Sequence, residues 1–152
     1  MSHILRMPGV PDHSRALLQQ LLAEDLIPVE ALPHIVESYR RVIHEARKKN
    51  PRTNVVMGDM IANSLVALLK KVTPKTGEQN LRIIQAAVRY FVIQNDGVTH
   101  DLETEAGFDD DARVVNAVLR FFGRDDLMID VPERRMPATR PSPAVEPARR
   151  AR

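Results

Sequence analysis

Residues 77–94 constrain the fold most, because apolar side chains recur there at the spacing of an α-helix. One apolar stripe is formed by Leu81, Ile84, Val88, Phe91 and Val92, and Ile83, Ala87 and Tyr90 widen it. A helix that is apolar on several sides buries those sides against neighbours. We therefore expect residues 77–94 to form the central helix of a helical protein.

Four further segments show helical periodicity, and each begins at a recognisable start signal. The signals are Asp12 or Ser14 as a cap, Pro33 in a first turn, Asn54 as a cap, and Asp109 or Asp110 as a cap. The central helix has Thr76 and Gln79 at the spacing of a capping box. These signals predict an all-α fold, a compact bundle of about five helices, and loops this short favour antiparallel neighbours.

Two other features refine this bundle. Gly58 weakens the third helix, expected from Val55, by about 1 kcal/mol relative to Ala, a cost that matters if another helix packs closely there. The triplet Asn95-Asp96-Gly97 ends the central helix; a hairpin turn is the alternative interpretation. We expect residues 125–129 to add a short turn that packs back on the core.

Charge and proline content divide the chain into three parts. Residues 1–11 are expected to be a flexible leader, residues 12–130 the helical domain, and residues 131–152 a disordered tail with five Pro. The tail has six Arg and two Glu, a net charge of +4, whereas residues 1–130 have 16 basic and 18 acidic side chains, a net charge of −2. The tail can contact nucleic acid, an acidic partner or anionic lipid, or it only aids solubility.

The residue types present exclude several kinds of active site. The chain has no Cys, no G-x-S-x-G, no Gly-rich phosphate loop and no H-E-x-x-H. A hydrolase that uses clustered carboxylates stays open. No apolar run is long enough for a secretory signal or a membrane span, so we expect a soluble, cytoplasmic protein.

The densest cluster of acidic side chains lies between residues 95 and 111, a segment with seven carboxylates and no Lys or Arg. Such carboxylates need solvent, basic partners or a hard cation such as Mg²⁺ or Ca²⁺. The spacing does not match an EF-hand, and His100 beside Asp101 would suit a transition metal. The alternative is that residues 109–111 only cap a helix and complement its dipole. Residues 40–52, with six basic groups against one Glu, can offset the charge.

The segment from Asn80 to Leu127 resembles the YkvA-like family, small bacterial helical proteins with a domain of unknown function. The matching positions are Phe91 as the aromatic near the helix end, Asp101 as the loop aspartate, Gly107, the paired Asp110 and Asp111, and Ala112. The family has prolines where this chain has Asn95, His100 and Thr104. The resemblance implies a helical hairpin with a polar turn whose aspartates are structural or bind a ligand, and it implies no activity.

These observations predict a non-enzymatic interaction or regulatory protein of the bacterial cytoplasm. Its acidic inter-helix turn and the adjoining helix ends would recognise a protein partner. One alternative is a divalent-cation domain, for Mg²⁺ or Ca²⁺, centred on Asp101, Asp110 and Asp111. The other is a nucleic-acid-associated protein that acts through its Arg-rich tail.

Overall fold

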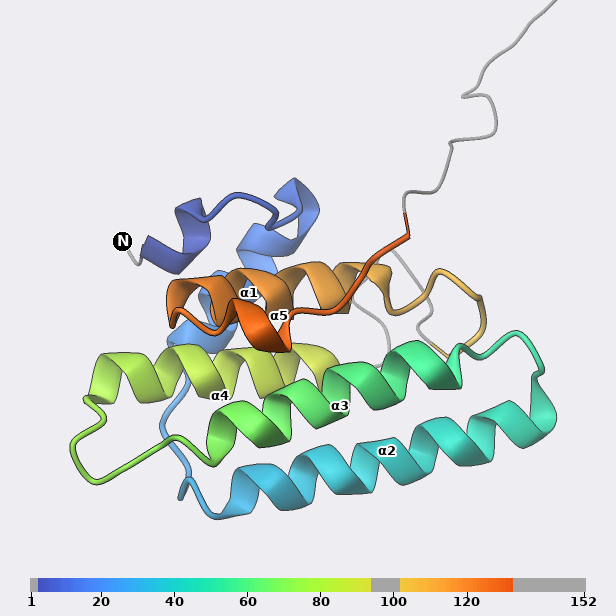
Figure 1. Cartoon of the computed structure of the whole chain (residues 1–152), viewed down its shortest axis with the longest axis horizontal. Coiled ribbons are helices and arrows are strands. Elements are labelled where there is room, and N and C mark those ends of the chain that lie inside the picture. The colour runs from blue at the N-terminus through green and yellow to red at the C-terminus, as the bar shows by residue number, and fades with distance from the viewer. Residues whose placement is uncertain (1–2, 94–101, 133–152) are drawn as a thin grey trace, which may run out of the picture.

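The computed structural model describes residues 3–93 and 102–132, and it confirms the all-α fold (Figure 1). Five α-helices and three short 3₁₀ helices occur in these residues, with no strand. They are η1 (His3–Arg6), η2 (Asp12–Ser14), α1 (Arg15–Leu22), α2 (Ala31–Lys49), α3 (Val55–Leu69), α4 (Glu78–Val92), α5 (Asp109–Phe121) and η3 (Asp125–Leu127). The expected stop at residues 95–97 and most of the expected tail lie outside the described residues. None of the described helices has the length and apolarity needed to cross a membrane.

Helix α4 is central, as its apolar residues predict, because it packs against each of the four other helices. Its buried residues are Ile83, Ile84, Gln85, Ala86, Ala87, Val88, Tyr90 and Phe91. The two polar side chains among them have partners. The Tyr90 hydroxyl lies 2.6 Å from the Ser14 hydroxyl, and the Gln85 amide bonds the backbone of Asp25 and Ile27. Burying α4 therefore leaves these polar groups satisfied.

Helices α2 and α3 form an antiparallel pair beside α4 (Figure 1). The Asn54 side chain accepts a hydrogen bond from the Met57 N–H at 3.1 Å, so the expected cap of α3 is confirmed. Gly58 faces α2, and a Cβ placed there would lie 3.0 Å from Ile43 Cδ1. Another helix therefore packs closely at Gly58, which is the condition under which a glycine matters there.

The side-chain hydrogen bonds expected at three other helix caps do not form, and the reason differs from helix to helix. Ser14 is the N-cap of α1, but its hydroxyl bonds Tyr90 rather than the helix. Gly77 is the N-cap of α4, while the Thr76 hydroxyl accepts from a backbone N–H in its own turn. Buried Phe108 is the N-cap of α5, which places all three aspartates inside its first turn.

The segment expected to be a loose leader packs onto the helices instead. Ile4, Leu5 and Val10 are buried, and η1 contacts α1 and α5. The Arg15 guanidinium donates to the carbonyls of Leu5 at 3.1 Å and Val10 at 3.3 Å. Apolar burial together with this arginine anchors residues 3–11, so the domain begins earlier than residue 12.

The chain after α5 returns to the core, as expected for residues 125–129. Gly123, at φ 71°, ends α5 in a Schellman motif, in which the Arg124 N–H bonds the Leu119 carbonyl at 2.8 Å. The Asn116 side chain then bonds both the N–H and the carbonyl of Ile129 at 2.8 Å. These bonds hold the segment after α5 against the bundle.

The contact at Gly58 predicts a specific loss of stability. Gly58→Leu should destabilise the fold by about 1–3 kcal/mol, because the new side chain collides with Ile43 and Phe108. Val56→Leu, at an exposed position of the same helix, is the control and should change stability by less than about 0.5 kcal/mol. Urea unfolding measures both, and equal values for the two variants would contradict the close approach.

Candidate functional site

The described part of the acidic turn, residues 102–108, lies against the loop between α2 and α3 (Figure 1). The Thr53 hydroxyl donates to the Leu102 carbonyl at 2.5 Å, and Thr53 is buried. The amides of Asn50 and Asn54 donate to the carbonyls of Glu103 and Glu105 at 3.4 and 3.1 Å. Side chains of the α2–α3 loop thus hold the backbone of the turn.

The basic end of α2 lies beside this turn, and the contacts described above run from side chains of the α2–α3 loop to backbone carbonyls of the turn. Arg47 donates to the Thr53 carbonyl at 3.1 Å, within the α2–α3 connection. Lys48 pairs with Glu45 at 2.8 Å, and this hydrogen bond raises the pKa of Lys48 and lowers the pKa of Glu45. The acidic side chains of Glu103 and Glu105 are exposed. The turn therefore presents carboxylates at the surface from a fixed backbone.

The three aspartates of the first turn of α5 occupy different environments. The Asp110 carboxylate lies 2.7 Å from His13 Nε2 and 3.1 Å from an Arg113 nitrogen. Asp109 and Asp111 are 5% and 2% exposed, so they face the interior while Asp110 faces η2. Carboxylates in a first turn also complement the positive end of the helix dipole. Asp110 thus joins the N-terminal segment to the start of α5.

Of the three residues predicted to hold a cation, Asp110 and Asp111 are among the described residues. Asp101 and His100 lie outside the described residues, and Asp110 and Asp111 face different surroundings. In residues 3–93 and 102–132, no three His, Asp or Glu side chains are arranged to hold one metal ion. The assignment of Asp101, Asp110 and Asp111 to one site stays a prediction.

An aromatic contact, which the sequence analysis did not select, fixes the turn from the inside. The ring of Phe108 is fully buried, and its centroid lies 6.1 Å from that of Phe91 on α4. Phe91 in turn meets Tyr39 of α2 edge-to-face at 5.1 Å. The one signal for Phe108 in the sequence is an aromatic residue alone in an acidic loop.

A second polar cluster joins α2 to α3 at the surface of the bundle, and the sequence did not predict it. The Arg40 guanidinium contacts Glu37 at 2.9 Å, Asp59 at 3.3 Å and Asn63 at 2.8 Å. His44 bonds the same Asp59 at 2.9 Å. The i, i+3 spacing of Glu37 and Arg40 was the available signal. Each group here bonds another, which suits a link between two helices.

Comparison with known proteins adds no assignment. No family model matches this chain, and neither a curated protein nor a solved structure matches it. The resemblance to the YkvA-like family therefore stays a prediction.

The hydrogen bond from Thr53 predicts how the turn is held. Thr53→Val should destabilise the fold by about 1 kcal/mol and speed amide exchange in residues 102–108, because the Leu102 carbonyl loses its donor. Thr104→Val, within the turn itself, is the matched control. Hydrogen exchange resolved along the chain measures the effect, and unchanged protection of the turn in Thr53→Val would contradict this anchoring role.

Proposed function

We propose that the chain is a non-enzymatic interaction module whose recognition surface is the acidic turn between α4 and α5. The observation that supports this most directly is the way the turn is held. Its backbone carbonyls take the anchoring bonds from Thr53, Asn50 and Asn54, and the side chains of Glu103 and Glu105 stay exposed. Carboxylates on a fixed backbone can meet a basic surface without a further ordering cost.

The partner that fits such a surface is a protein with a basic face. A cluster of exposed negative charges raises the rate of association with a basic protein and disfavours association with an acidic protein. The packing of the Phe108 ring against Phe91 of α4 fixes the position of this surface relative to the core. In this proposal the protein acts in the bacterial cytoplasm and regulates or recruits its partner.

Charge reversal at the turn tests the proposal. Glu103→Lys combined with Glu105→Lys should abolish capture of the partner from a lysate of the source cells, because attraction becomes repulsion. The charge-matched control is Asp25→Lys combined with Asp130→Lys, at exposed positions away from the turn. Affinity purification with quantitative mass spectrometry compares the variants against the unmodified chain.

The control variant, and a chain truncated after Val131, should both keep the same partner. Retention of the partner by the Glu103/Glu105 variant would overturn the proposal. Loss of the partner on truncation alone would assign recognition to the Arg-rich tail instead.

A divalent-cation site centred on Asp101, Asp110 and Asp111 is the second candidate, and the concentration of carboxylates at the start of α5 supports it. Asp109, Asp110 and Asp111 all lie in the first turn of α5, at the end of a loop rich in further carboxylates. Hard cations take such oxygen ligands, with Mg²⁺ or Ca²⁺ as the candidates. A bound cation at the start of α5 would leave the exposed Glu103 side chain at the surface for a protein partner.

This candidate predicts a metal-dependent stability. Mg²⁺ or Ca²⁺ at 100 times its dissociation constant should stabilise the fold by about 2.7 kcal/mol, and Asp111→Asn should abolish that increment. The increment is compared within each variant, with and without a chelator, so that any intrinsic effect of the substitution cancels. A melting temperature that responds to neither ion would remove the cation site.

A further inference from the structure

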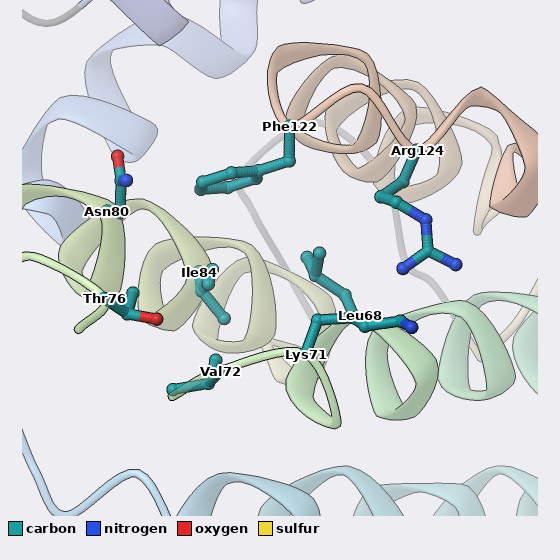
Figure 2. A pocket seen from close by; sticks show the side chains of 8 residues that line it. All are labelled: Leu68, Lys71, Val72, Thr76, Asn80, Ile84, Phe122 and Arg124. Carbon is teal, nitrogen blue, oxygen red and sulfur yellow. The ribbon is translucent and has the colours of Figure 1, made fainter. Parts of the chain in front are cut away.

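At the end of the bundle opposite to the acidic turn, a hollow of about 440 Å³ opens between α3, α4 and the end of α5 (Figure 2). Its apolar lining consists of Leu68, Val72, Ile84 and Phe122. Thr76 and Asn80 lie on one side of it, and Lys71 and Arg124 on another. The volume falls within the range of small-molecule sites in proteins, about 300–1,000 Å³.

The two cations share one side of an otherwise apolar hollow. Figure 2 shows the side chains of Lys71 and Arg124 extending to the same side of the pocket, from the ends of two different helices. Arg124 also pairs with Asp126 at 2.9 Å, and this hydrogen bond lowers the pKa of that carboxyl. Two positive groups and one negative group leave a positive charge at this edge.

Helix dipoles explain part of this arrangement. Lys71 follows the end of α3, and Arg124 follows the end of α5, where cations complement the partial negative charge of the carbonyls. The dipoles do not require both side chains to border the same apolar hollow. That combination, an apolar volume with cations at one edge, is complementary to an apolar molecule with an anionic head.

We propose that this hollow binds a small amphipathic carboxylate, whose aliphatic chain contacts Ile84 and Phe122 and whose carboxylate is held by Lys71 and Arg124. Nε and Nη2 of Arg124 bond Asp126 at 3.0 and 2.9 Å, so the other guanidinium nitrogen and the Lys71 ammonium would hold the ligand's carboxylate. The Arg-rich tail is the wrong occupant, because residues 132–152 hold six Arg and two Glu and these cations would repel it. This inference is independent of the function proposed for the acidic turn.

Decanoate, titrated into the full chain and followed by the chemical shifts of backbone amides, is the direct test. We expect saturable one-to-one binding, with the shift changes concentrated at the residues that line the hollow. Affinity should rise from hexanoate to octanoate to decanoate, by up to about fourfold per methylene, since each added group is buried. Decanol, which lacks the charge, should bind about tenfold more weakly than decanoate.

Lys71→Glu is the variant that separates this site from general adsorption. Lys71 is exposed, so the variant should fold, and its decanoate affinity should fall by about tenfold while its decanol affinity changes little. Lys48→Glu, an equally charged change at the far end of α2, is the matched control and should bind decanoate as the unmodified chain does.

Three results would overturn the proposal. The first is shift changes centred on the exposed apolar residues Val42, Val56 and Met60, which would show adsorption elsewhere. The second is equal loss of affinity in Lys71→Glu and Lys48→Glu, or no loss in either. The third is a concentration-dependent dimer whose interface covers Phe122, because a second copy would then fill the hollow.

Discussion

The burial of α4 is the interaction on which the rest of the structure depends. Helix α4 contacts all four other helices, so each of them packs against the apolar surface of this one helix. The two polar side chains that this burial would leave unsatisfied recruit partners from distant segments, Ser14 for Tyr90 and the backbone near residue 25 for Gln85. These hydrogen bonds favour a single packing arrangement of α1 and the segment after it on α4. A buried polar group without a partner would cost about 1–3 kcal/mol.

The packing around α4 also determines where the acidic turn lies. Phe91 at the end of α4 and Phe108 at the start of α5 meet in the core, so the chain between them has fixed ends. The α2–α3 loop then binds the turn from outside through Thr53 and Asn54. The exposed side chains of Glu103 and Glu105 thereby extend from a backbone that is held in place, and the proposed recognition of a basic partner relies on this.

Local signals predicted the helices well, and non-local contacts account for what they missed. Periodicity placed α4, and the structure adds the close helix contact at Gly58, which the sequence left conditional. The anchoring of the first residues could not be read, because it depends on Arg15 reaching back to carbonyls after the fold has formed. Likewise His13 and Asp110 are 97 positions apart, and no local pattern predicts their contact. The hydrogen bond of Ser14 to Tyr90 is equally non-local, whereas the Thr76 hydroxyl accepts a bond within its own turn.

The two proposed sites lie at opposite ends of α3, α4 and α5, and this separation has a physical consequence. Each site is built from helix termini and loops, where polar groups that the helices leave unsatisfied meet side chains from neighbours. The interior between them is packed apolar surface, in which Gly58 already brings two helices close. Surface substitutions at one end share no partner with the other end, so their effects on stability should add. Departure from additivity would then show that the two ends of the bundle are energetically coupled.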